Sequence, residues 1–479
     1  MTVIDRLQRL TKEAVSPPRK AVLTPGEGTP VRETHRSGES EASCSQSEAS
    51  CSQSEASSLK IGALRRRLDA VLARRPGGAD MSPPRRREPG HPLEEIVSGM
   101  EIATAGGRFF CAASAWGMGH CHGACRLGDL PPLDMAGAAI LANDAALAGL
   151  DPGRGVFLDT ETTGLAGGTG TVAFLIGLGW FEGARFVVKQ LFMRDFAEER
   201  AALLFLGELM ADRQFLVTFN GKAFDANLLA ARFVMNRLAD PLAGLPHLDL
   251  LHPARRLLRC RLDNVRLGTL EGALLGLERE EDIPGWEIPQ RYFQWLRHRD
   301  GGLVADIFVH NRLDVLSMAF LAARLTELIG GPVSGAAPPP PDPDLLAAAR
   351  LCIHRGETAR AEGILTDLRR RSGPTTARQA ATLLSLIHKR AGAWNEAVAI
   401  WREMLAPDRG GPDGDALFPL LELAKWNEHR DHDYRTALEL ACRALDLLPP
   451  QGTATEENDL RRRIARLKRR LAGQDRPAT

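Results

Sequence analysis

Two acidic residues at the end of an apolar run constrain this chain more than any other feature. Val156, Phe157 and Leu158 have the composition of a short buried strand, and Asp159 and Glu161 follow directly. Side chains two residues apart on a strand point to the same face, so these two carboxylates should converge. Their convergence is costly unless a cation lies between them, and oxygen ligands favour Mg²⁺ or Mn²⁺. The alternative is a strand end with two solvated acids.

The segment around this pair alternates between strand and helix patterns. Apolar or alternating runs at 171–181 and 185–193, joined by residues 182–184, predict a hairpin. Further strands are predicted at 215–219 and 247–250, and helices at 198–211, 223–238, 253–258 and 305–328. Hairpin-linked strands followed by strand–helix alternation predict an α/β domain over residues 151–329, with a mixed sheet and helices on its faces. Residues 91–150 are interpreted as an extension that packs on this domain, with a strand near 108–112 and a helix over 136–147.

The rest of the chain divides by composition. Residues 1–90 contain a tandem Ser-rich repeat and too little apolar sequence to offset the entropy of ordering, which predicts disorder. Their arginine clusters are interpreted as solvated charge rather than a nucleic-acid-binding arm. A Gly/Pro linker at 330–343 precedes an all-α domain over 344–450, in which residues 344–368 and 377–391 are predicted helices. The last residues, 451–479, are interpreted as a basic tail, mostly a solvated helix face.

Two further carboxylates lie in patterns that could bring them to the same centre. Residues 218–229 predict a strand, a tight Asn-Gly turn and a helix whose first turn carries Asp225, where a carboxylate complements the helix N-terminus. On the long helix at 305–328, His310 lies one turn before Asp314, on the same face. An imidazole at this place suits proton transfer near neutral pH. For an isolated Asp225, simple stabilisation of the helix start would be the alternative.

These three segments resemble the motifs of a known superfamily. The strings Asp159–Leu165 (DTETTGL), Thr218–Leu229 (TFNGKAFDANLL) and His310–Ser317 (HNRLDVLS) resemble the motifs of the DEDD 3′–5′ exonucleases, which have the ribonuclease H-like fold. Residues 247–256 and the loop at 282–293 resemble the YprB-like predicted exonucleases of bacteria, which join this domain to helical repeats. Strings such as LLSLIHKRAGAWNEAVAIWREML resemble tetratricopeptide hairpins.

The resemblance implies a fold, an activity and a set of site residues. The fold would be a mixed five-stranded sheet with flanking helices, and the activity would be hydrolysis of phosphodiester bonds with two Mg²⁺ or Mn²⁺ ions, releasing nucleoside 5′-monophosphates. The metal ligands would be Asp159, Glu161, Asp225 and Asp314. His310 would be the general base, although the superfamily shows His-x4-Asp or Tyr-x3-Asp and this chain has His-x3-Asp. Hydrogen-bonding support is the alternative role of His310.

The expected partner is the 3′ end of single-stranded DNA or RNA. A dense run of arginines could follow a phosphate backbone, although a solvated helix face is the alternative; they are Arg255, Arg256, Arg259, Arg261 and Arg266. Four aromatic residues could stack on bases, although core packing is the alternative; they are Phe224, Trp286, Tyr292 and Trp295. The residues expected to contact nucleic acid are Thr162, Asn220, Lys222, Phe224, Arg255 and Arg256. The helical repeats could also dock a protein partner.

Composition adds weaker limits. The formal net charge of +1 creates no global field for polyanions. Eight scattered cysteines indicate reduced thiols and a cytoplasmic protein, and no apolar run is long enough to predict a membrane span. Zinc is conceivable at Cys111, His120, Cys121, His122 and Cys125, but ordinary packing is the simpler interpretation. Two other functions remain open: a scaffold protein with an inactive ribonuclease H-like domain, and hydrolysis of a small nucleotide in a closed pocket.

Overall fold

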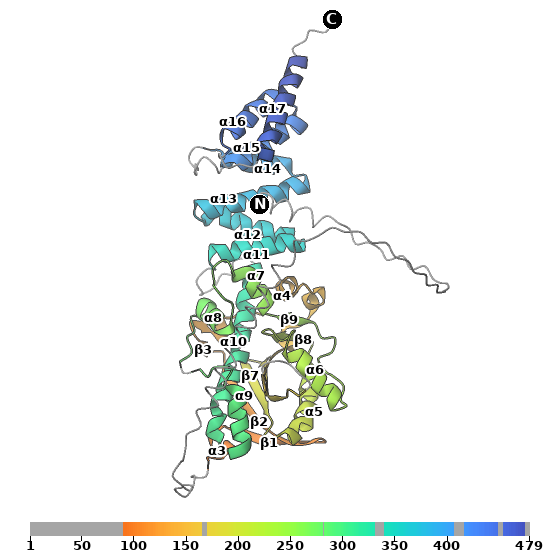
Figure 1. Cartoon of the computed structure of the whole chain (residues 1–479), viewed down its shortest axis with the longest axis vertical. Coiled ribbons are helices and arrows are strands. Elements are labelled where there is room, and N and C mark those ends of the chain that lie inside the picture. The colour runs from red at the N-terminus through yellow and green to blue at the C-terminus, as the bar shows by residue number, and fades with distance from the viewer. Residues whose placement is uncertain are drawn as a thin grey trace, which may run out of the picture. The chain divides into compact units, whose positions relative to one another are not determined.

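The computed structural model of the chain describes residues 90–164, 170–280, 282–330, 340–406, 416–448 and 454–474. The predictions made for residues 1–89 lie outside these residues, as do those for most of the linker. By its internal contacts, Gly90–Thr479 forms a unit separate from Met1–Pro89. Figure 1 shows this unit as a sheet covered by helices, from which further helices continue toward the C-terminus.

One mixed sheet organises the first half of the described residues. Its strand order is β1-β2-β7-β6-β5-β8-β9. Neighbours from β1 to β5 are antiparallel, whereas β5, β8 and β9 are parallel. The strands are β1 Gly99–Thr104, β2 Gly107–Gly117, β5 Gly155–Thr162, β6 Ala173–Glu182, β7 Arg185–Phe192, β8 Phe215–Thr218 and β9 His247–Asp249. A separate two-stranded ribbon joins β3 Cys121–His122 to β4 Cys125–Arg126.

The sheet has seven strands, so the expected number of five was wrong. The two additional strands, β1 and β2, come from the segment that was expected only to pack on the domain. β2 pairs with β7 over its whole second half, from Phe110 opposite Phe192 to Gly117 opposite Arg185. This pairing joins residues far apart in sequence, so it could not be predicted from short-range periodicity.

The predicted hairpin and helices are present within a few residues. Glu182 pairs with Arg185 across the turn, and Gly183 takes the left-handed φ of 56° that such a turn requires. The helices of this half are α3 Leu93–Ile96, α4 Met135–Ala142, α5 Glu199–Met210, α6 Asp225–Met235, α7 Leu251–Leu258, α8 Leu267–Leu270, α9 Ile288–His298 and α10 Ala305–Gly330.

The two faces of the sheet are covered by different helices. On β7, Lys189 lies over the ring of Phe205 in α5, with Nζ 5.5 Å from the ring centroid. The next residue, Gln190, points the opposite way and donates to the Phe308 carbonyl of α10 at 2.9 Å. Because successive side chains of a strand alternate between faces, α5 and α10 lie on opposite sides of the sheet. The long helix α10 therefore crosses behind the central strands that carry the acids.

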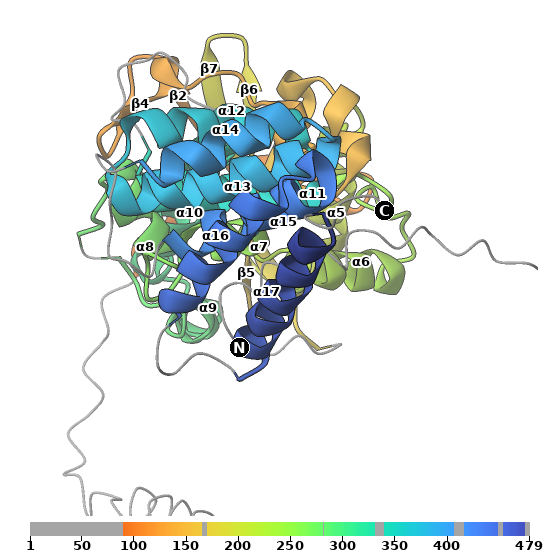
Figure 2. The same ribbon diagram turned by 90° about the horizontal axis from the view of Figure 1, so that it is seen from above.

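The remaining helices form a successive array. They are α11 Asp342–Arg355, α12 Thr358–Arg371, α13 Pro374–Ala391, α14 Trp394–Met404, α15 Leu417–Trp426, α16 Tyr434–Asp446 and α17 Ala454–Gln474. Each contacts the next along the chain, and Figure 2 shows α12, α13 and α14 side by side. The single helix predicted over 344–368 is two helices, because Gly356 ends α11 with a left-handed φ of 83°.

The basic tail proved to be part of this array. Leu460 and Leu467 of α17 are buried, and α17 contacts α16. Arg463 and Arg466 pair with Glu428, whose side chain is fully buried. The other face carries exposed side chains, among them Arg461, Arg462, Lys468 and Arg469, so the predicted solvated face lies beside a buried one.

The chain described here has no helix that combines the length and the apolar character needed to cross a membrane.

Candidate active site

Strand β5 and helix α10 bring most of the predicted acids together. β5 lies inside the sheet between β6 and β8 and is buried over Gly155–Leu158, and its C-terminal half presents Asp159 and Glu161. The register with β6 shifts between Glu161 and Thr162, which ends regular pairing at the site. α10 crosses this end of the strand and presents His310 and Asp314. Glu161 is 12% exposed and Asp314 is 15% exposed, so both carboxylates are largely removed from solvent.

The fourth acid, Asp225, occupies the first turn of α6, as expected. The turn before it is shaped by the buried Asp249, which accepts hydrogen bonds from the backbone amides of Asn220 (2.8 Å) and Lys222 (3.0 Å). Asn220 takes a left-handed φ of 68° there. Asp225 is tied to β5 because the hydroxyl of Thr160 donates to Asp225 Oδ1 at 2.5 Å. The strand–turn–helix pattern thus places Asp225 beside the pair on β5.

Burial, joined by repulsion between the acids, raises the pKa values of three members of this group. Burial, then the charges of Asp314 and Asp225, raise the pKa of Asp159 well above its ordinary value. Burial, then Asp159 and Asp314, do the same to the pKa of Glu161. Burial raises the pKa of Asp225 to about 6, against the hydrogen bond from Thr160. These carboxyls therefore resist ionisation in the protein alone, and an added cation would relieve the repulsion.

Asn311 holds Asp159 in place, a role that the sequence did not reveal. Its Nδ2 donates to Asp159 Oδ2 at 2.9 Å, while Gln190 Nε2 donates to its Oδ1 at 2.9 Å. Asn311 is fully buried, and a Cβ at Gly177 of β6 would collide with its side chain. The one available signal was an amide residue between His310 and Asp314, on a helix whose buried face is mostly apolar.

Two further residues of the site lie in the loop before α9 and were also missed. Arg279 Nη1 lies 2.6 Å from Asp314 Oδ1, and the same guanidinium pairs with Glu271 and with Asp282 (3.2 Å). Asp282 Oδ1 in turn lies 2.6 Å from His310 Nδ1. The sequence indicated this loop only as a resemblance, and its contacts with α10 depend on tertiary structure.

His310 faces the acids through its other ring nitrogen. Nε2 lies 3.9 Å from Glu161 Oε1 and 3.7 Å from Asp314 Oδ2. The ring is therefore oriented by Asp282 on one side and directed at the acidic centre on the other. Such an arrangement of acid, imidazole and reaction centre is typical of a general base.

The donor set fits a hard divalent cation in its chemistry but is not assembled around one. Carboxylate oxygens with raised pKa values are the ligands that such an ion would relieve. However, no three Asp, Glu, His or Cys side chains of the described ranges stand close enough together to hold an ion as they are. Asp314 is paired with Arg279 instead. This pair uses Asp314 Oδ1, whereas Oδ2 faces His310.

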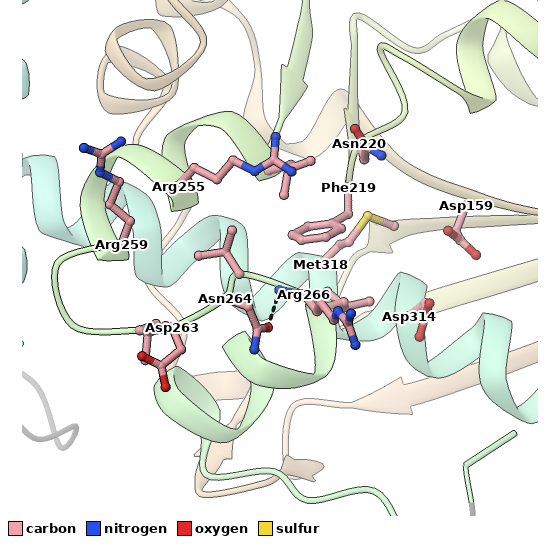
Figure 3. A pocket seen from close by; sticks show the side chains of 14 residues that line it. Asp159, Phe219, Asn220, Arg255, Arg259, Asp263, Asn264, Arg266, Asp314 and Met318 are labelled. Atoms are coloured by element: carbon pink, nitrogen blue, oxygen red, sulfur yellow. Dashed lines mark hydrogen bonds between the residues drawn. The ribbon is translucent and has the colours of Figure 1, made fainter. Parts of the chain in front are cut away.

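An open groove of about 670 Å³ extends from the acidic centre (Figure 3). Asp159 and Asp314 line one end, and Arg255, Arg259 and Asp263 lie toward the other. Asn220, predicted to contact nucleic acid, also lines the groove, as do Phe219, Arg266 and Met318. An open groove differs from the closed pocket that a small-nucleotide hydrolase would show.

The other predicted nucleic-acid contacts are distributed around the site. The Thr162 hydroxyl donates to the Gly164 carbonyl at 2.8 Å, at the end of β5. Lys222 is exposed, and Phe224 is 52% exposed beside Asp225. Arg256 is exposed but does not line the groove. Of the aromatic residues considered for stacking, Tyr292 and Trp295 are buried in the core and Trp286 is 65% exposed.

The cysteines and histidines near β3 belong to separate environments. Cys111 is buried within β2, whereas Cys121 is exposed at the start of β3. Buried His122 forms a hydrogen bond with the Ser317 hydroxyl at 2.7 Å. Throughout the described part of the chain, no cluster with three such ligands is present here either.

Known proteins with similar sequence extend these observations. Residues 156–326 match the RNase H superfamily. The protein of Bacillus subtilis (strain 168) described as "Uncharacterized protein YprB" is 36% identical over 322 residues, which cover 66% of this chain and 75% of the relative. The matched superfamily region contains β5 to β9 and α10, and so includes every predicted acid. The chain therefore belongs to the same family as YprB and carries a domain of the RNase H superfamily.

Proposed function

We propose that this protein is a metal-dependent 3′–5′ exonuclease acting on single-stranded DNA or RNA. The observation that carries the proposal is the convergence of Asp159, Glu161 and Asp225, all with raised pKa values, at the end of an open groove lined by arginines. Membership of the RNase H superfamily supports nuclease-type chemistry. Release of nucleoside 5′-monophosphates from the 3′ end follows from the motif resemblance.

In this proposal, the four acids would hold two Mg²⁺ or Mn²⁺ ions. Bound there, the ions would lower the pKa of water and stabilise the leaving 3′ oxygen. Asn311 keeps the Asp159 carboxylate oriented through its 2.9 Å hydrogen bond, and Thr160 does so for Asp225. Both hydrogen bonds restrict the carboxylates before a cation binds, so less side-chain conformational entropy would be lost on binding.

His310 is the proposed general base. When the Nδ1–H group donates a hydrogen bond to Asp282, Nε2 carries no proton, and its lone pair is directed at the space beside Glu161 and Asp314. There it can take a proton from the attacking water as the bond between phosphorus and the 3′ oxygen breaks. Asp282 is then a positioning residue, because it acts through the imidazole.

The test is shortening of 5′-labelled single-stranded DNA and RNA by the full chain. We expect removal of nucleotides from the 3′ end in Mg²⁺ or Mn²⁺, no cleavage with chelator, and no cleavage by an Asp159→Ala/Glu161→Ala variant. A 3′-phosphorylated strand is a further control, since a blocked end should slow an exonuclease but not an endonuclease. If neither polymer is cleaved in either metal, the proposal is wrong.

A specific observation favours a second candidate, a nucleic-acid-binding or scaffold protein with an inactive domain. Arg279 already neutralises Asp314 at 2.6 Å, so the protein could remain in this ion-paired state. Calorimetric titration with Mn²⁺ separates the two candidates. Binding that disappears in Asp159→Ala/Glu161→Ala supports the nuclease, whereas no binding in the wild type supports the scaffold. The helical array α11–α17, proposed as tetratricopeptide-like, would then be the place to search for a protein partner.

A further inference from the structure

Resting on the proposed function, we infer that the groove beside α7 binds the backbone of a single-stranded polynucleotide through Arg255, Arg259 and Arg266. The protein would therefore act on strands several nucleotides long rather than on mono- or dinucleotides. The 3′ terminal phosphodiester lies at Asp159 and Asp314, and preceding phosphates follow the three arginines away from the acidic centre. The same arginines define where the strand enters.

The geometry places these cations along one path. Arg255 and Arg259 are four residues apart on α7 and so lie on one face of the helix. The helix rises about 6 Å between them, which is comparable to the spacing of successive phosphates in an extended strand. Arg266 lies across the groove, in the turn that begins with Asn264, and in Figure 3 it reaches toward Asp314. The three guanidinium groups thus lead from the far end of the groove to the acids.

The neighbouring arginines do not line the groove, so the three groove arginines are distinguished by their position in the structure and not by the arginine content of the segment. Arg261 is used internally, because it pairs with Asp344, whose side chain is 1% exposed, at 2.7 Å. Arg256 is directed away from the groove, and its charge acts on Arg355 of α11. In contrast, Arg255, Arg259 and Arg266 are exposed and form no ion pair with any carboxylate in the described ranges. Asp263, at the far end, is the one acid besides the active-site pair that lines the groove.

The floor of the groove suits unpaired bases. Phe219 and Met318 lie between Arg255 and the acids in Figure 3. Aromatic and other apolar side chains beside a basic path are the combination that single-strand-binding sites use, since every base has a face that can stack. A single phosphate would need only one of these arginines, and the groove of about 670 Å³ leaves room beyond one nucleotide. Both features favour a longer strand.

Strand binding and hydrolysis are measured separately, so that failure of the inferred binding site is distinguished from failure of the proposed exonuclease function. Fluorescence anisotropy with chelator present follows binding of 5′-labelled oligothymidylate and oligouridylate, two to twelve nucleotides long, to the full chain. A chromogenic thymidine 5′-monophosphate ester, which lacks further phosphates, reports hydrolysis in Mn²⁺. The variants are Arg255→Gln/Arg259→Gln/Arg266→Gln and two controls. Arg256→Gln removes a neighbouring charge of α7, and Arg185→Gln removes an exposed arginine of the β6–β7 hairpin.

We expect wild-type affinity to increase with strand length over the first several nucleotides and then level off. The triple variant should bind twelve-nucleotide strands about tenfold or more weakly, and its slope of log K against log salt should be smaller by about 2, the loss of three phosphate contacts on a single strand. Both controls should bind like the wild type, and ester hydrolysis should be the same in the two controls and the wild type.

Unchanged affinity and salt slope in the triple variant would overturn the inference, as would wild-type affinity that does not depend on length. An equal loss in Arg256→Gln would also overturn it, because it would indicate general charge attraction rather than the groove. If neither ester nor strand is hydrolysed but the triple variant still loses binding, the proposed hydrolysis fails and the binding site stands.

Discussion

The RNase H-like domain and the helical array both bury carboxylates, but they treat them in opposite ways. In the array, Glu422 is 7% exposed and pairs with Lys389 (2.5 Å) and Lys425 (2.7 Å). Burial alone would raise the pKa of Glu422, yet the two lysines outweigh it and hold the pKa below its ordinary value. In the RNase H-like domain, Asp159 and Glu161 face other acids, and their pKa values are raised.

This difference separates acids that serve stability from acids that serve a site. A buried carboxylate with its own cation stabilises the fold once it is in place, whereas a cluster of unneutralised carboxylates costs stability in the protein alone. Groups that are perturbed in this way gather at functional sites. The comparison therefore supports β5 and α10 as the place of the proposed cation site.

The largest expected effect is on the acidic centre. Asp159→Asn/Glu161→Gln should lower nuclease activity roughly 10³-fold or more, because the proposed ligands of the cations that would stabilise the transition-state charge are lost. In chelator, the same variant should melt about 2–4 °C higher than the wild type, because like charges have been removed. The sign follows from the raised pKa values: the folded state binds protons more tightly than the unfolded state, so ionisation at neutral pH opposes folding. Scanning calorimetry and the strand-shortening assay test this. A lower melting temperature would contradict the comparison.

The next effect concerns the proposed base and its partner. His310→Gln should lower kcat by about 10²-fold or more, the usual contribution of general base catalysis. Asp282→Asn should lower kcat by roughly tenfold with little change in KM, since it positions His310 through the 2.6 Å contact and does not touch the strand. Single-turnover kinetics with saturating strand measure both. Equal activity of Asp282→Asn and wild type would remove Asp282 from the mechanism.

In the helical array, removal of a buried carboxylate charge should destabilise the protein, whereas in the acidic centre it should stabilise the protein. Glu422→Gln should lower the free energy of unfolding by roughly 2 kcal/mol, less than for a fully buried pair because Lys389 and Lys425 are each about one-third exposed. Chemical denaturation measures the change. The matched control is Glu457→Gln, which removes an exposed pair with Arg461 and should cost less than about 0.5 kcal/mol. A stabilised Glu422→Gln protein would erase the contrast between the regions.

The smallest effect is a pH dependence within the RNase H-like domain. Burial, then the charges of Arg279 and His120, lower the pKa of His122 from 6.5 to about 4. Between these values the unfolded chain takes up a proton and the folded protein does not, so stability falls as the pH falls. The loss from pH 6.5 to 5.5 should be about 1 kcal/mol. The raised carboxyls act in the opposite sense, so the measurement compares wild type with His122→Gln by calorimetry. Identical profiles would indicate that His122 is protonated in the folded protein.

Much of the fold could be predicted from local patterns. The β6–β7 hairpin, helices α5 and α10, the strand end that carries Asp159 and the helix start that carries Asp225 follow from periodicity and turn residues that act over a few positions. The same holds for His310 and Asp314, which share one face of α10 because they are four residues apart. These features depend on neighbours in the sequence, which a single chain displays directly.

Tertiary structure alone decided the rest. The pairing of β2 with β7, the burial of α17 through Glu428, and the contacts of Arg279 and Asp282 with α10 all join segments that are distant in sequence or connected by irregular loops. It also divided a uniform run of arginines into Arg261, held by Asp344, and the three that face the groove. Periodicity indicates which side of a helix or strand is apolar, but only tertiary packing determines which residue each side chain contacts. For this reason the sequence determined the type of chemistry, whereas the structure determined which residues orient it and where a substrate can lie.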